Sequence, residues 1–456
     1  MNDIAMDITS TLAGFVADCR WADLPDAVRK EAKRSLVNVV ATSFAGCNEP
    51  PVVTAIAGLR PFGAAGTASV IGRADRLDAC SAAFVNAMSA NVFDFDDTHP
   101  ATIIHPSAPV APALFAYAET YGLSGADLLL GFALGAEALC RIGNAVSPGH
   151  YRRGWHITST CGVFGAALAT GKVLGLDRQR LVWAIGNAAV QTGGLVETLG
   201  TMSKSISVGN AARNGLLSAL LARDGFSGPA RPLEGERGFL RVATETPRLE
   251  AVCTGLGTTW ELLTNTYKPY PCGVVLNPVI EACLVLAEDQ RLALAEIERI
   301  EVVGHPLLRE RTDRPGVRSG RESQVSAQHA IAVTLVRRKA GLPEFSDEAV
   351  ADPALRALGA KVAFKDDDAY AVDAARVSIR LRSGVVLDRF VEHAYGGPAR
   401  PMTDADLERK LRQLAEYGGV RRDLAPLIDA LWNLERVDNA ASVLALARSN
   451  DAPRTA

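Results

Sequence analysis

The sequence predicts a mostly α-helical protein, with a large all-α domain built from both ends of the chain and a smaller α+β domain between them. Three observations support this prediction. Apolar residues recur at spacings of three and four over most of residues 8–260. Alternating β-branched runs appear only after that region. The helical pattern returns from Thr403, and a tail of roughly 45 residues makes a poor independent core.

A chain of 456 residues is too long for one ordinary hydrophobic core. We therefore expect a discontinuous helical domain, with residues 1–267 as its first part and residues 398–456 as C-terminal helices that rejoin it. Residues 268–397 form the expected α+β domain.

The expected helices of the first part are amphipathic or apolar on all sides. Pro25 suits a first helical turn and Gly46 suits a closing position. Glycine-rich helices later in this part predict a dense core, because small residues let helix axes approach closely. The expected helices span residues 25–46, 82–92, 110–121, 125–142, 158–174, 178–191, 207–223 and 233–242.

The pattern changes at YKPYPCG (residues 267–273), which reads as a rigid connection fixed by its prolines. The β-branched runs at residues 375–381 and 385–391 are separated by three residues that end in Gly384, which predicts a hairpin. Thr403 is the expected N-cap of the first returning helix. The other expected elements are helices at 278–287 and 323–340 and a strand at 297–303.

The composition excludes several classes of protein. An apolar fraction of 48% and a charged fraction of 22% are typical of a soluble globular protein. A net charge of −3 offers no basic field for nucleic acid or for an anionic membrane. The eight cysteines are scattered without a CxxC pair, so we expect buried thiols. No secretion signal and no uninterrupted apolar run of about 20 residues is evident, which predicts a cytoplasmic protein.

The stretch NVFDFDDTHPATIIHPSAPVAP (residues 91–112) carries the most chemistry. It combines Asp94, Asp96, Asp97, His99 and His105 with four prolines in 22 residues. Because a proline inside a helix removes a donor and clashes with the preceding turn, we expect an irregular loop here. Irregular loops on rigid scaffolds often carry function.

The histidines are clustered in the sequence, because four of the chain's seven lie within about sixty residues of one another. Two of them are in the stretch at residues 91–112, and two are in GHYRRGWHITST (residues 149–160). Imidazole titrates near pH 6.5, so His99, His105 and His156 could accept or donate a proton. The alternative is that each is a hydrogen-bonded structural histidine. The aspartates could orient a histidine, cap a helix or bind a metal. We predict no metal, because no HxxxH or HxH spacing accompanies them.

Two lysines are singled out by their context. Lys204 lies in GTMSKSISVGNAARNG, just before a helix expected to open at Ser205 or Ser207, where helix N–H groups favour an anion. Lys268 lies at the expected domain junction, a favoured place for a ligand site. Solvated surface lysines are the alternative for both. Cys161 and Cys272 are better explained as packed thiols than as nucleophiles.

Over essentially its whole length the chain resembles the MmgE/PrpD family. The resemblance rests on DFDDTHPATIIHPSAPVAPA (94–113), GHYRRGWHITSTCGVFGAALA (149–169), AIGNAA (184–189), GTMSKSISVGNAARNG (200–215) and YKPYPCG (267–273). The family includes 2-methylcitrate dehydratases, cis-aconitate decarboxylases and iminodisuccinate epimerases. The resemblance implies a helical domain made from both chain ends, an α+β lid domain, a homodimer and chemistry without a cofactor.

The resemblance also assigns roles. Catalytic roles fall to Asp94, His105 and His156, with Tyr151 as a further acid in epimerase-like members. Substrate-binding roles fall to Thr98 and to two lysines that would hold carboxylates, Lys204 and Lys268. We also expect His99, as a loop histidine, to bind substrate. Such reactions need a base near carbon and cations for the carboxylates.

Two positions depart from the family. Asn277 stands where many relatives have histidine, and His329 stands where decarboxylase-like relatives have tyrosine. A neutral amide cannot shuttle protons, so these departures argue against decarboxylation and make His329 a candidate proton donor of this chain's own. We therefore expect a dehydratase of the 2-methylcitrate type acting on a small di- or tricarboxylate. A dicarboxylate epimerase, a cis-aconitate-type decarboxylase and an inactive carboxylate-binding protein are the alternatives.

Overall fold

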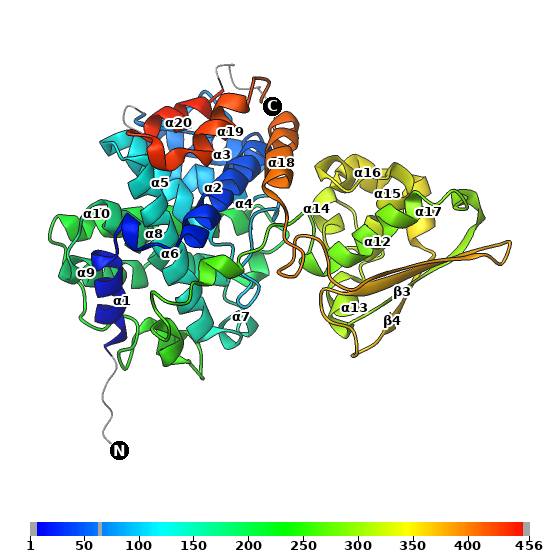
Figure 1. Cartoon of the computed structure of the whole chain (residues 1–456), viewed down its shortest axis with the longest axis horizontal. Coiled ribbons are helices and arrows are strands. Elements are labelled where there is room, and N and C mark those ends of the chain that lie inside the picture. The colour runs from blue at the N-terminus through cyan, green and yellow to red at the C-terminus, as the bar shows by residue number, and fades with distance from the viewer. Residues whose placement is uncertain (1–6, 63–65, 450–456) are drawn as a thin grey trace. The chain divides into compact units, whose positions relative to one another are not determined.

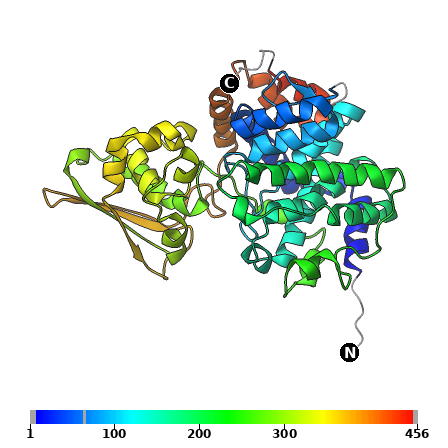
Figure 2. The same cartoon turned by 180° about the vertical axis from the view of Figure 1, so that it is seen from behind.

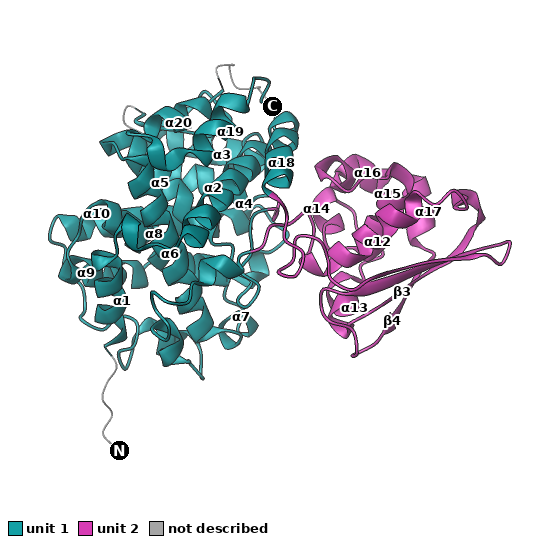
Figure 3. Cartoon of the chain, viewed as in Figure 1, with its two compact units in different colours: residues 1–92, 96–265, 404–456 teal, residues 93–95, 266–403 magenta. Residues whose placement is uncertain are grey.

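The computed structural model describes residues 7–62 and 66–449. The chain divides into two compact units, drawn in different colours in Figure 3. Unit 1 takes residues 1–92, 96–265 and 404–456, and unit 2 takes residues 93–95 and 266–403. The prediction of a mostly helical protein with a small sheet is confirmed. The lid function expected of the smaller part stays a prediction.

In the residues of unit 1 that the structure describes, the regular elements are helices apart from one short antiparallel pair, β1 (Ala68–Ser69) and β2 (Arg76–Leu77). Figure 1 labels most of its helices. They are α1 (Ile8–Asp18), α2 (Asp26–Gly46), α3 (Pro50–Leu59), α4 (Ala79–Asn91), α5 (Ser107–Tyr121), α6 (Gly125–Val146), α7 (Gly149–Arg152), α8 (Ile157–Val173), α9 (Arg178–Ala189), α10 (Ser203–Arg223), α11 (Phe239–Ala243), α18 (Asp404–Tyr417), α19 (Ala425–Trp432) and α20 (Ala441–Leu446).

The C-terminal helices pack on elements from the start of the chain, as Figure 1 shows for α18 beside α2. Helices α19 and α20 contact α2 and α5 respectively. An ion pair joins Arg34 of α2 to Asp404, the first residue of α18.

The centre of unit 1 is α8, which packs against both α6 and α10. Glycines let these helices touch through their backbones. A Cβ atom built on Gly165 of α8 would lie 2.8 Å from the carbonyl oxygen of Gly135 in α6, and one built on Gly135 would lie 2.6 Å from that of Gly165. The close crossing therefore requires glycine at both positions.

We expect Gly165→Ala to lower the free energy of unfolding by about 1–3 kcal/mol, because the added methyl group meets backbone that cannot move aside. Gly58→Ala is the control, since a Cβ atom there has nothing within 4 Å and alanine favours the helix by about 1 kcal/mol. Thermal melts of the two variants check this. Equal melting temperatures would contradict the close crossing.

Helix α6 is long and apolar enough to cross a membrane by length and composition, the only such helix among the described residues. However, 94% of its apolar window is buried by the rest of the protein. It also carries the buried pair Glu137 and Arg141. These are the properties of a core helix.

Unit 2 combines a four-stranded sheet with short helices. The strand order is β4-β3-β5-β6, in which β3 pairs parallel with β4 and antiparallel with β5, and β5 pairs antiparallel with β6. The elements are α12 (Asn277–Ala287), β3 (Ile297–Gly304), α13 (Pro306–Thr312), α14 (Gly320–Ser323), α15 (Ala327–Arg337), α16 (Asp347–Ala351), α17 (Pro353–Gly359), β4 (Val362–Asp366), β5 (Ala375–Leu381) and β6 (Val386–Val391).

One face of this sheet is covered by helices. Figures 1 and 2 show α12, α15, α16 and α17 gathered on the same side of it. Helix α12 contacts β5 and β6, and α15 contacts both α12 and α17. Along β5 the buried residues alternate, with Ala375, Val377, Ile379 and Leu381 facing this core.

Several expected elements are confirmed, including α2, the β5–β6 hairpin and β3, and five details were wrong. The helix expected at residues 323–340 is α15, which spans only Ala327–Arg337. Helix α5 begins at Ser107 and continues through Pro112, so the irregular loop is shorter than expected. Helix α10 begins at Ser203 without a side-chain cap, rather than at Ser205 or Ser207. Residues 233–238 are not helical, since α11 spans only Phe239–Ala243. Strand β4 was missed because its short segment lacks clear alternation.

All eight cysteines are free thiols, and six of them are buried as expected, whereas Cys80 and Cys253 are only partly buried. Burial raises the pKa of Cys161 and Cys272 to about 12, so almost no thiolate forms at neutral pH. These two residues act as packed apolar side chains.

Candidate active site

The loop between α4 and α5 has a tightly folded middle. The N–H of His99 donates to the carbonyl oxygen of Ile104, and the N–H of Ile103 donates back to that of His99, each at 2.8 Å. Ile103 has φ 57°, in the left-handed region that a β-branched residue rarely adopts. Asp94 also has a left-handed φ of 54°, which aspartate adopts more readily. Strained backbone of this kind clusters at functional sites.

His105 closes this loop and lies buried in unit 1. Its Nδ1 is 2.9 Å from the carbonyl oxygen of Asp97 and 3.2 Å from Oδ1 of Asp96. A carbonyl oxygen only accepts, so Nδ1 carries the hydrogen and Nε2 carries the lone pair of the neutral ring. The His105 N–H donates to Oγ1 of Thr158 in the first turn of α8, which ties the loop to that helix.

Asp97 is fully buried beneath His105. Its Oδ2 accepts from Oγ of Ser107 at 2.5 Å and from Nδ2 of Asn265 at 2.6 Å. Burial raises the pKa of Asp97 to about 6, although these donors and His105 oppose the shift and the neighbouring charge of Asp96 adds to it.

This pKa predicts how stability changes with pH. The carboxyl titrates near 3.8 when unfolded and near 6 when folded, so folding takes up a proton between these values. The cost of burying the charge grows as pH rises through 6 and is relieved at lower pH. The amide of Asp97→Asn carries no charge. As pH rises from 4 to 7, we therefore expect the free energy of unfolding of this variant to rise relative to that of the wild type by on the order of 2 kcal/mol.

Melting temperatures measured from pH 4 to 7 check this prediction. Asp26→Asn is the control, because the Asp26 side chain is 97% exposed, and its curve should run parallel to that of the wild type. An Asp97→Asn curve that also stays parallel would show that the raised pKa is wrong.

His156 lies at the N-cap of α8 and is also buried in unit 1. Its Nδ1 is 3.1 Å from Oγ of Ser207, and that hydroxyl is 2.7 Å from the carbonyl oxygen of Lys204. Lys204 is buried in the first turn of α10. Thr158 therefore links the His105 loop to α8, the helix that His156 precedes. Ser207 links His156 to the backbone of Lys204 in α10.

Lys268 and Asp94 form a pair within unit 2. Nζ of Lys268 lies 2.6 Å from both the carbonyl oxygen and Oδ2 of Asp94. The lysine is buried, whereas the Asp94 side chain is 37% exposed. A substrate carboxylate would have to compete with Asp94 for this ammonium group, and the binding role of Lys268 stays a prediction.

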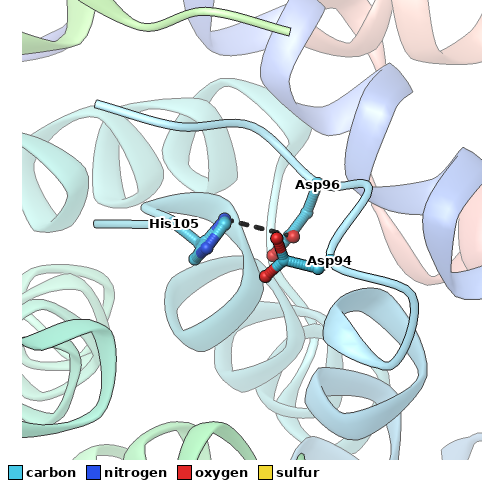
Figure 4. A group of neighbouring side chains, drawn as sticks. All are labelled: Asp94, Asp96 and His105. Carbon is cyan, nitrogen blue, oxygen red and sulfur yellow. Dashed lines mark ion pairs between the residues drawn. The ribbon is translucent and has the colours of Figure 1, made fainter. Parts of the chain in front are cut away.

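Figure 4 shows Asp94, Asp96 and His105, each of which offers a ligand atom within 4.8 Å of the others. The dashed line marks the ion pair between His105 and Asp96. Lys268 already supplies a positive charge to Asp94, so a metal ion would have to displace it. The group fits a carboxylate–imidazole network better than a metal site, and our proposal involves no metal.

The other predicted residues of unit 1 lie in different settings. His99 is buried, with Nδ1 2.7 Å from Oγ1 of Thr102 and Nε2 3.0 Å from Oε2 of Glu261. These contacts fix the orientation of the His99 ring. Thr98 is buried beside it, and Tyr151 is half-buried in α7. Their predicted roles stay predictions.

The two departures from the family lie in unit 2. His329 donates from Nε2 to the carbonyl oxygen of Glu344 at 2.8 Å, and burial lowers its pKa, so it is neutral at pH 7. It lines a cavity of about 310 Å³ with Arg318 and Arg356. Asn277 is buried at the start of α12, with Oδ1 3.8 Å from Sγ of Cys272. The proton-donor role of His329 stays a prediction.

The sequence did not predict three residues that contact the two histidines. Asp96 was considered as an orienter, a helix cap or a metal ligand but was given no place in the predicted site, although it is the carboxylate beside His105. Thr158 and Ser207 were not singled out for contacts with the histidines, because they lie 53 and 51 residues from their partners. No local spacing could have revealed those contacts.

Unit 1 thus buries His105 and His156, and Nδ1 of each lies within hydrogen-bond distance of an oxygen atom. Histidines fixed in this way are typical of the class of enzymes that transfer protons. Two family models match this chain, the MmgE/PrpD N-terminal domain over residues 10–251 and the MmgE/PrpD C-terminal domain over residues 270–434. The chain therefore belongs to the MmgE/PrpD family.

Proteins similar to this chain include two from fungi and one from human. A cis-aconitate decarboxylase of Aspergillus terreus is 30% identical, covering 95% of this chain and 96% of the relative. A cis-aconitate decarboxylase-like protein of Aspergillus oryzae is 30% identical over 98% and 95%. The human cis-aconitate decarboxylase is 28% identical over 98% and 96%. Decarboxylases are lyases, so the family relationship supports a lyase at this coarse level.

Proposed function

We propose that the protein is a lyase that acts on a small di- or tricarboxylate by moving a proton at the carbon next to a carboxylate. The observation that carries the proposal is the pair of buried histidines in unit 1. His105 and His156 both carry the hydrogen on Nδ1, which is held by an acceptor, so Nε2 is the nitrogen that takes up a proton. This chemistry calls for no organic cofactor.

The neighbours of His105 support its role in proton transfer. When Nε2 gains a proton, the ring becomes positive, and the carboxylate of Asp96 at 3.2 Å stabilises that charge. The backbone oxygen of Asp97 keeps the ring in one orientation. His156 is the second proton-transfer group, and the buried ammonium of Lys204 is assigned to a substrate carboxylate.

The group that leaves is either carbon dioxide or water. The names of the relatives favour carbon dioxide. In that reaction the C–C bond to one carboxylate breaks, its electrons shift the double bond, and a carbon next to a remaining carboxylate takes a proton. His329, which stands where decarboxylase-like relatives have tyrosine, and Asn277, which stands where many relatives have histidine, favour water. In that reaction a base removes the proton next to a carboxylate while an acid protonates the departing hydroxyl group.

The purified protein should be incubated with cis-aconitate, 2-methylcitrate and citrate, while carbon dioxide release and ultraviolet absorbance are followed. Carbon dioxide release from cis-aconitate identifies a decarboxylase. A rise in absorbance with a hydroxy acid identifies a dehydratase, because a conjugated double bond forms.

The alternative activities need further measurements, namely optical rotation with a chiral dicarboxylate, and binding and proton exchange for every compound. Loss of optical activity from a chiral dicarboxylate without a new product would identify an epimerase instead. Binding without turnover or proton exchange for any compound would contradict the enzyme proposal. The homodimer and the cytoplasmic location also stay predictions.

A further inference from the structure

Ser207 connects the two elements that carry His156 and Lys204. It lies in the first turns of α10 and is 8% exposed. Its Oγ is 3.1 Å from Nδ1 of His156 and 2.7 Å from the carbonyl oxygen of Lys204. One hydroxyl group therefore makes two hydrogen bonds.

Counting hydrogens fixes the direction of both bonds. A serine hydroxyl has one hydrogen, and a backbone carbonyl oxygen can only accept. The hydrogen of Ser207 therefore goes to Lys204, and the bond between the hydroxyl and His156 must use a hydrogen on the imidazole. Nδ1 of His156 is then the donor, and Nε2 carries the lone pair in the neutral ring.

The surrounding backbone holds this arrangement in place. The N–H of His156 donates to the carbonyl oxygen of Gly194 at 3.0 Å, and the Ser159 hydroxyl lies 2.6 Å from the carbonyl oxygen of Ser207. Gly194 has φ +122°, and a Cβ atom there would lie 2.9 Å from Cβ of Ser159 and 3.1 Å from Cβ of Ser207. The close approach of the segment around Gly194 to α8 and α10 thus depends on glycine at this position.

We propose that Ser207 is a positioning residue that sets the tautomer of His156. The inference rests on the proton-transfer role proposed for His156 and adds the group that makes its Nε2 the proton acceptor. Without the Ser207 acceptor both tautomers become accessible, and the Nε2–H form cannot take up a proton at that nitrogen. Partners of this kind, which orient a functional histidine, typically change activity by about 10- to 100-fold when removed.

The experiment compares Ser207→Ala with Ser207→Thr in the full-length protein, using ¹⁵N NMR of the imidazole rings and the pH dependence of kcat. The control is Ser218→Ala, in the same helix, which loses a similar hydroxyl bond to the carbonyl oxygen of Asn214 at 2.6 Å. Threonine keeps the hydroxyl group and should restore both readouts.

In the wild type we expect the His156 signals of the Nδ1–H tautomer at neutral pH. In Ser207→Ala we expect a mixture with the Nε2–H tautomer, a kcat lower by about 10- to 100-fold and a KM close to that of the wild type. The pH profile of kcat should also change. Ser218→Ala should change none of these, even if it lowers the melting temperature.

The two readouts separate the inference from the proposed function. An Nε2–H tautomer in the wild type, or an unchanged tautomer in Ser207→Ala, overturns the role of Ser207. The wild-type spectrum decides this even if the alanine variant does not fold. A shifted tautomer in Ser207→Ala with an unchanged kcat supports Ser207 as the residue that sets the tautomer of His156. The same result contradicts the proton-transfer role of His156.

Discussion

His105→Asn should lower kcat by about 10² to 10⁴-fold while leaving the protein folded. Asparagine can still donate to the carbonyl oxygen of Asp97, but an amide cannot take up or give a proton at neutral pH. His156→Ala should cause a loss of similar size, because a second group must move the other proton. Steady-state kinetics and circular dichroism of both variants check this.

His393→Asn is the matched control for these two variants. The His393 side chain is 46% exposed and pairs with Asp373 at 3.1 Å, away from both candidate histidines in the sequence. We expect its kcat to match that of the wild type. Retention of kcat within about threefold by His105→Asn would remove His105 from the mechanism.

Arg141→Ala should lower the free energy of unfolding by about 3–5 kcal/mol. Arg141 is 1% exposed and donates to Oε1 of Glu137 at 2.6 Å. Its guanidinium also donates to the carbonyl oxygens of Thr254 and Thr259, at 2.8 and 2.7 Å. The variant would leave a buried carboxylate and several buried carbonyl groups without their donor.

Denaturant melts of Arg141→Ala and Arg20→Ala measure this difference. Arg20 forms an ion pair with Asp23 at 3.1 Å, but its side chain is 78% exposed, so water screens the pair and its loss should leave the midpoint close to that of the wild type. Equal midpoints for the two variants would show that the buried pair does not hold residues 252–259 in place.

Much of the fold could be predicted because periodicity is a local signal. The helix expected from Pro25 to Gly46 is α2, and the strands expected on either side of Gly384 form β5 and β6. The errors arose where tertiary packing overrides local preference. Pro112 lies inside α5, where a proline costs a hydrogen bond. Strand β4 is held by parallel pairing with β3, and a local sequence pattern does not predict such long-range pairing.

The candidate site could be predicted only in part for the same reason. The residue types of the loop pointed to His105 and its aspartates, since they lie close together in the sequence. The contact of His156 with Ser207 spans 51 residues, and that of Asp97 with Asn265 spans 168. Such contacts depend on how α8, α10 and the loop pack, so a single sequence does not reveal them.

The most direct test of the account follows polycarboxylates by NMR in deuterated water, with the wild type and with His105→Asn. We predict that the wild type converts cis-aconitate or 2-methylcitrate with exchange of a proton at the carbon next to a carboxylate, and that the variant loses conversion and exchange together. Conversion at equal rates by both proteins would contradict the claim that a buried imidazole of unit 1 moves the proton.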